Sequence, residues 1–183
     1  LTALADGGAS IIRLTSPALI ELKVETSAPT ANFVDAYDLK RDLTAYLQQY
    51  PALPAQSFAE LATDQQLSSD VVPLWEEIMS SSYDSRATYL ERHADGKRMR
   101  TELLTLYQTH DLDVLAYPTA TLEAAKLGEA QSHFNCKLAA ASGLPAISVP
   151  AGFGNHDMPV AIELMAEPWA EQKLLNLAYT IEQ

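Results

Sequence analysis

The stretch SGLPAISVPAGF, residues 142–153, decides how this chain is built. A glycine and a proline precede its apolar run AISV, and a proline and a glycine follow it. Short apolar runs with these residues at both ends are typical of buried strands. We therefore expect a strand here, and a preceding helix, QSHFNCKLAAAS (131–142), that ends at Gly143.

Two further apolar runs resemble this one. They are LDVLAYPT at residues 112–119 and MPVAIELMA at residues 158–166, and both are apolar on the two faces that a strand would present. Such runs indicate strands covered by helices on both sides of a sheet. The closing segment, residues 169–183, predicts an amphipathic helix with its apolar side chains facing inward: Trp169, Leu174, Leu177, Ala178 and Ile181.

The first two thirds of the chain is mainly helical by pattern. Helical spacing covers residues 32–49, a region near 72–78, and the long segment 84–110, in which Gly96 is expected to bend or interrupt the helix. Ser57 with Glu60 three residues later forms a capping box for a short helix. The remaining N-terminal residues predict a helix that ends at Gly7–Gly8, followed by a short strand at residues 9–14. The fold class is α/β, with a central mixed sheet flanked by helices.

Composition and charge exclude several classes of function. With 183 residues and a net charge of -12, the chain would be repelled by nucleic acid and by an anionic membrane surface. No apolar run approaches the roughly 20 residues that a spanning helix needs. The single cysteine, Cys136, permits no internal disulfide and fits a reducing compartment, so we expect the cytoplasm. Because the chain starts at Leu1, without methionine or a signal-peptide pattern, we expect it to be cut from, or a portion of, a longer precursor.

The residues contain no complete catalytic set. Residues 7–10 (GGAS) have the helix-then-strand order opposite to that of a phosphate loop, and the serines at 80–82 are typical of a helix connector. His133 and Cys136 share a helix face, but that spacing rarely aims an imidazole at the sulfur, so Cys136 is interpreted as a small apolar residue. Residues 110–113 (HDLD) fit a helix end better than a metal cluster. We expect neither a metal nor a cofactor.

Five segments together resemble the amidase signature family. FNCKLAAASGLPAISVPAGF (134–153) and MPVAIELMAEPWAEQKLLNLAYTIEQ (158–183) are similar to its C-terminal part. YDLKRDLTAYLQQYP (37–51), HDLDVLAYPTA (110–120) and ALADGGASIIRL (3–14) resemble earlier segments of the same family. The resemblance therefore covers nearly the whole chain, as a single C-terminal portion of an amidase signature domain over residues 1–183.

The chain departs from the family pattern in a few places. Alanine stands at 161 and 166, where glycine is usual, and the segment YPTATLEAAKLGE (117–129) lacks the extra prolines common in this loop. The alanines leave the predicted fold intact. Because these prolines are missing, the sequence does not define the form of the pocket wall that this loop would build.

The resemblance implies hydrolysis of a carboxamide, a C–N bond, to an acid and ammonia or an amine. The family uses a Ser–cis-Ser–Lys triad, whose members lie in its first half, so no catalytic residue is expected in this chain. Its partner would be the N-terminal part of the same amidase, within one precursor or as a separate chain, and its substrate a small-molecule amide. Assembly of identical copies is left open, and isolated chains should expose apolar surface where the missing part belongs.

The resemblance and the strand ends together suggest four substrate-binding residues: Tyr117, Thr119, Phe134 and Asn135. Open α/β sheets bind ligands beside the ends of their strands, and these residues adjoin two such ends. For two of them a purely structural role is also open: Thr119 as a cap, and Asn135 as a hydrogen-bond partner of a loop carbonyl. For the chain as a whole, the alternative function is a noncatalytic binding or assembly module derived from the amidase fold.

Overall fold

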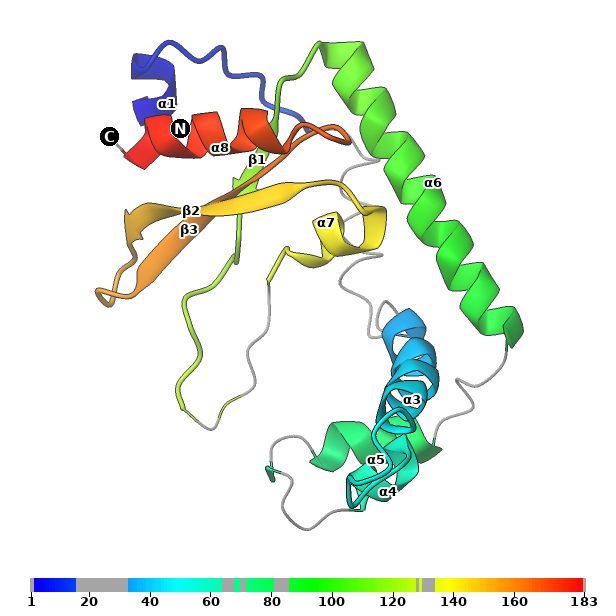
Figure 1. The fold of residues 1–183 in the computed structure, drawn as a ribbon. Helices are drawn as coiled ribbons and strands as arrows, with labels where there is room; N and C mark the ends of the chain where they lie inside the picture. Colours follow the sequence, from blue (N-terminus) through cyan, green and yellow to red (C-terminus); the bar gives the residue numbers. More distant parts are fainter. Residues whose placement is uncertain are drawn as a thin grey trace. The chain divides into compact units, whose positions relative to one another are not determined.

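A computed structural model describes residues 2–15, 33–63, 68–69, 72–80, 86–127, 129 and 134–182 of the chain. They belong to two compact units, one formed by Leu1–Ala28 with Gly96–Gln183 and the other by Pro29–Asp95. Figure 1 shows the fold, with the sheet and helices α1 (Thr2–Asp6), α7 (Lys137–Ser142) and α8 (Glu171–Glu182) in the first unit and helices α3 (Phe33–Leu47), α4 (Phe58–Ala62) and α5 (Val72–Ser80) in the second.

The sheet of the first unit has three strands in the order β1-β3-β2. The strands are β1 (Leu115–Pro118), β2 (Ala146–Phe153) and β3 (Pro159–Met165), and β3 pairs antiparallel with both neighbours. The three predicted strands are therefore confirmed. The register shifts between Pro150 and Phe153 on β2, where Gly152 adopts a φ of 103° that a side chain would strain.

Helices cover both faces of this sheet, as the strand pattern predicts. Helix α8 (Glu171–Glu182) packs on one face, while α7 (Lys137–Ser142) and the later part of α6 (Arg86–His110) pack on the other (Figure 1). Because neighbouring residues of a strand point to opposite faces, β3 contributes to both apolar clusters, with Leu164 on one face and Met165 on the other. The α8 side buries Val149, Leu164, Ala166, Leu174 and Ala178; the other side buries Met99, Leu103, Tyr107, Leu144 and Met165.

Close packing between α6 and α7 explains the glycine inside the long helix. A Cβ atom on Gly96 would lie 2.7 Å from the carbonyl oxygen of Ala141. Four residues later, Arg100 donates from Nη1 to the carbonyls of Ser142 and Gly143, at 3.1 and 2.8 Å, where α7 ends. The helix runs unbroken from Arg86 to His110. The interruption expected at Gly96 is therefore absent, and the glycine provides room for a neighbouring backbone.

The second unit is built from short helices around a small apolar cluster. It contains α3 (Phe33–Leu47), α4 (Phe58–Ala62) and α5 (Val72–Ser80), and the buried side chains of Phe58 and Ile78 form its centre. The predicted capping box is confirmed, because the Ser57 side chain accepts from the Glu60 amide. In return, the Glu60 carboxylate accepts a hydrogen bond from the backbone amide of Gln56. In the usual capping box this donor is the amide of the N-cap residue itself, one position later.

Two expectations at the ends of the chain are wrong. The N-terminal helix α1 (Thr2–Asp6) ends as predicted, with Gly8 at a φ of 93°, but residues 9–14 form no strand. Ile11 and Ile12 are 42% and 49% exposed, and a strand is stable only with a partner for its backbone groups. Trp169 does not face inward: it is 91% exposed, because it precedes α8 at a φ of 67° and lies outside the helical repeat.

Among the residues that the structure describes, no helix is both long enough and apolar enough to cross a bilayer.

Candidate functional site

The sequence-predicted site residues gather where β1 ends. Tyr117 is the third residue of β1, directly opposite Glu163 on β3, which in turn lies opposite Ser148 on β2. The Tyr117 hydroxyl donates to Oε1 of Glu163 at 2.5 Å. Glu163 is only 4% exposed, so this contact satisfies a buried carboxyl group. Burial raises the pKa of Tyr117, and the hydrogen bond to Glu163 raises it further, which keeps the phenol a donor.

Thr119 extends this polar row beyond the strand. Its amide donates to the carbonyl of Ala161 at 3.0 Å, which adds one more rung to the ladder between β1 and β3. Its hydroxyl lies 3.3 Å from that of Ser148. Thr119 therefore belongs to a hydrogen-bonded group that reaches all three strands, rather than to a helix cap.

Asn135 closes the loop that leaves β1. Its side-chain amide donates to the carbonyl of Pro118 at 2.7 Å, and its backbone amide donates to the carbonyl of Thr119 at 2.8 Å. The chain segments on either side of residues 120–134 are thus held together by one asparagine. The side-chain amide of Asn135 thus hydrogen-bonds a backbone carbonyl, which is the structural role predicted as the alternative to substrate binding.

Phe134 lies beside Asn135 and is more open to solvent. It bridges Ala120 in an isolated antiparallel pair, and its side chain is 39% exposed. The Lys137 ammonium lies 5.6 Å from the centre of its ring. Of the four predicted residues, Phe134 thus presents an aromatic side chain at the surface, whereas Tyr117 and Asn135 direct their polar groups to neighbours.

A second contact holds the same loop further along. Glu123 Oε2 lies 2.6 Å from Nδ1 of His156, and its Oε1 accepts from the His156 backbone amide at 3.3 Å. His156 lies in the turn between β2 and β3, near Gly154. A Cβ atom on Gly154 would lie 2.1 Å from Glu123 Oε1, so the glycine makes room for the carboxylate. These hydrogen bonds from His156 lower the pKa of Glu123.

Sequence reasoning missed four residues of this site: Ser148, Glu163, Glu123 and His156. Glu163 carried a usable signal, because it is the one charged residue within the apolar strand PVAIELM. A charge at such a position implies a buried partner. Glu123 and His156 are separated by 33 positions, and nothing in their local patterns links them.

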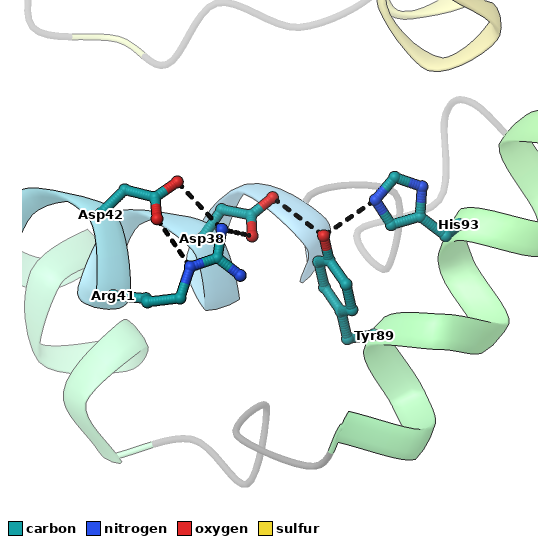
Figure 2. Close-up of polar contacts among 5 residues, drawn as sticks. All are labelled: Asp38, Arg41, Asp42, Tyr89 and His93. Carbon is teal, nitrogen blue, oxygen red and sulfur yellow. Dashed lines mark hydrogen bonds and ion pairs between the residues drawn. The ribbon is translucent and has the colours of Figure 1, made fainter.

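Another polar cluster lies in the second unit (Figure 2). The hydroxyl of Tyr89 on α6 lies 2.9 Å from Nε2 of His93, and it donates to the carboxylate of Asp38 on α3 at 3.5 Å. Arg41 pairs with both Asp38 and Asp42, which lowers the pKa of the Asp42 carboxyl. The rings of Tyr37 and Tyr89 lie 4.5 Å apart. The cluster joins α3 to the start of α6, and its polar atoms bind one another.

The residues rejected as catalytic groups show no catalytic arrangement where the structure describes them. Asp113 pairs with Lys173 at 2.8 Å, and Cys136 is an exposed free thiol at the start of α7. His133, its proposed neighbour, lies outside the described residues. Within the described part of the chain, no three His, Cys, Asp or Glu side chains gather closely enough to hold a metal ion.

Comparison with known proteins identifies the family. The model of the family described as Amidase matches residues 3–175. The chain is 34% identical over 113 residues to one subunit of the glutamyl-tRNA(Gln) amidotransferase from Halothermothrix orenii, covering 58% of this chain and 23% of that protein. It is 27% identical to mandelamide hydrolase from Pseudomonas putida, covering 100% of this chain and 38% of that protein.

Solved structures share the fold. Peptide amidase from Stenotrophomonas maltophilia matches with a TM-score of 0.70 at 24% identity, over 91% of this chain and 39% of that chain. An amidase family protein from Bacillus anthracis matches with a TM-score of 0.64 at 21% identity, over 81% of this chain and 28% of that chain. The chain thus spans well under half the length of the relatives and structures that it matches.

Proposed function

This chain belongs to the amidase signature family, and on that premise we propose that it is the C-terminal part of an amidase that hydrolyses a carboxamide. The observation that carries the proposal is the match of the family model to residues 3–175. The matched relatives are longer, since the chain covers 23% and 38% of the two compared above. We therefore assign the Ser–cis-Ser–Lys triad implied by the resemblance to a part of the protein that these 183 residues do not contain.

In this proposal the chain completes the sheet and forms a wall of the substrate pocket. The wall is the loop after β1 together with the residues that precede α7. Thr119 and Phe134 are the candidates for direct contact with an amide substrate, because the Phe134 side chain is 39% exposed and Thr119 lies next to a strand end. Tyr117 and Asn135 support them from behind, through their bonds to Glu163 and to Pro118.

The activities for which the relatives are named bear on the substrate class. They include a mandelamide hydrolase, a fatty acid amide hydrolase from Arabidopsis thaliana and a peptide amidase. Each name describes an amide whose C–N bond is cleaved. We propose a small-molecule amide as the substrate of this chain's parent protein, in preference to an RNA-linked one, because a net charge of -12 disfavours nucleic acid.

The test compares the 183-residue chain alone with the chain combined with an N-terminal amidase part that carries the triad. Ammonia release from a panel of aryl, alkyl and peptide carboxamides is the measurement. We expect no release from the chain alone and turnover from the combination. If the combined parts bind each other but release no ammonia from any amide, the noncatalytic module is the better assignment.

A further inference from the structure

Two contacts of described residues attach the loop between β1 and α7 to the sheet and its turns. The first is the bond set of Asn135 at the end of β1, and the second is the contact of Glu123 with His156 in the β2–β3 turn. Between them lie exposed apolar side chains, Leu122 and Leu127. A surface loop with exposed leucines would lose less entropy on binding if it were already fixed in place.

The contact between Glu123 and His156 is specific in three ways. The carboxylate meets both the ring and the backbone amide of the same residue, at 2.6 and 3.3 Å. The Glu123 side chain is 25% exposed although its partner's is 81% exposed, so the carboxylate is partly inserted beside the turn. The space that it enters is left open by Gly154, as described above. A carboxylate that merely lay on the surface would need no such space.

We propose that Glu123 and His156 form a positioning pair that holds the loop after β1 against the β2–β3 turn. The functional consequence of this pair rests on the proposed function. With the loop fixed, Thr119, Leu122 and Leu127 present one defined wall to an amide substrate. Neither Glu123 nor His156 contacts the reacting atoms in this assignment. They act through the loop, so their loss affects substrate binding more than the chemical step.

The first experiment needs no amide. Trypsin cleaves after Lys126, an exposed residue in the loop, and the rate of this cut in the complete chain reports how often the loop leaves its place. We expect Glu123→Gln and His156→Gln each to speed the cut by roughly threefold, the size expected for losing one exposed ion pair. The double variant should be no faster than either single one, because the two residues act as a pair.

Two further variants separate this proposal from a general loss of structure. Gly154→Ala keeps both charges but displaces the carboxylate, and it should also speed the cut. Asp157→Asn removes a charge from the same turn but leaves the contact between Glu123 and His156 in place. It should leave the rate of trypsin cleavage unchanged. Circular dichroism checks that every variant is folded. Equal rates for Asp157→Asn and Glu123→Gln, or additive effects in the double variant, would overturn the pairing.

The second experiment uses the chain combined with its catalytic part. We expect Glu123→Gln to raise KM severalfold while kcat changes by less than about twofold, as for an interaction made equally in the ground and transition states. A change confined to kcat would contradict a role in positioning the wall. Cleavage rates that behave as predicted without any amide turnover would refute the proposed function and leave the positioning pair standing. Amide turnover by the combined parts, with trypsin cleavage rates unchanged in the variants, would support the proposed function and refute the positioning pair.

Discussion

At the scale of single residues, the most unusual feature is a carboxyl group buried in the central strand. Glu163 is 4% exposed and binds the hydroxyl of Tyr117. A buried polar group is costly when it loses its partner, since it cannot return to water. The apolar pattern of β3 predicts its burial, but the identity of the partner depends on the strand register, which the sequence does not reveal.

The bond between Tyr117 and Glu163 should be visible in stability. We expect Tyr117→Phe to lower the free energy of unfolding by about 1–3 kcal/mol, because it removes the donor to a buried carboxyl group. Tyr46→Phe is the matched control: Tyr46 is 54% exposed, so its change should stay within about 0.5 kcal/mol. Urea denaturation followed by circular dichroism measures both. Equal changes in the two variants would mean that the buried bond is worth nothing.

The Glu123 carboxyl group should titrate below its ordinary value. The hydrogen bonds from the His156 ring and backbone amide lower its pKa from 4.5. A lowered pKa means that the contact stabilises the fold fully above 4.5 and is lost as the pH falls through the lower, folded-state value. Carboxyl-detected NMR titration should show this, and His156→Gln should move the pKa of Glu123 back up. An identical titration in the two proteins would contradict the contact.

At the scale of elements, the strands and helices with clear end signals were predictable. Glycines at the ends of α1 and α7, with φ of 93° at Gly8 and 64° at Gly143, mark helix ends that local chemistry alone specifies. The strand expected at residues 9–14 is wrong because a strand also needs a neighbour. The inward Trp169 is wrong because the amphipathic repeat was extended beyond the true start of α8 at Glu171.

The glycine within α6 tests how tightly two elements pack. Alanine is favoured over glycine inside a helix by about 1 kcal/mol, so an open position would be stabilised by Gly96→Ala. Here the new methyl group would lie 2.7 Å from the backbone oxygen of Ala141, which cannot move aside as a side-chain end could. We therefore expect a net loss of about 1–3 kcal/mol, typical of overpacking.

Chemical denaturation distinguishes the two outcomes for Gly96→Ala. Lys97→Ala, at the neighbouring position, is the control and should change stability by less than about 0.5 kcal/mol. A more stable Gly96→Ala protein would show that α7 lies further from α6 than the structure has it.

At the scale of the whole molecule, the resemblance predicted the family and the fold, while the site was only partly predictable. Tyr117, Thr119, Phe134 and Asn135 do lie close together at the end of β1, and their contact with a substrate stays a prediction. What each side chain does depends on partners up to 46 positions away, such as Glu163 for Tyr117. Sequence periodicity carries information on which face a residue occupies and none on which residue lies opposite.

The three-stranded sheet also has edges that the described residues leave uncovered. Strands β1 and β2 each pair with β3 on one side, and no other described strand pairs with either. Unpaired edges favour association with another chain. Helix α8 shows the same incompleteness, because Leu175 and Tyr179, one turn apart, are 55% and 66% exposed. The proposal that the rest of an amidase covers this surface would account for both features.

The exposed side of α8 therefore supports a prediction about assembly. We expect the isolated chain to self-associate, and Leu175→Glu with Tyr179→Glu to reduce that association without loss of helix, since both side chains lie outside the buried cluster. Asn176→Glu with Thr180→Glu places two acidic residues, also one turn apart, further round the exposed side of the same helix and is the control for charge. Light scattering gives the mass of each protein, and the same variants should weaken capture of the N-terminal part. If the Leu175 and Tyr179 double variant keeps the mass distribution and capture of the unmodified chain, α8 is not the surface that the rest of the amidase covers.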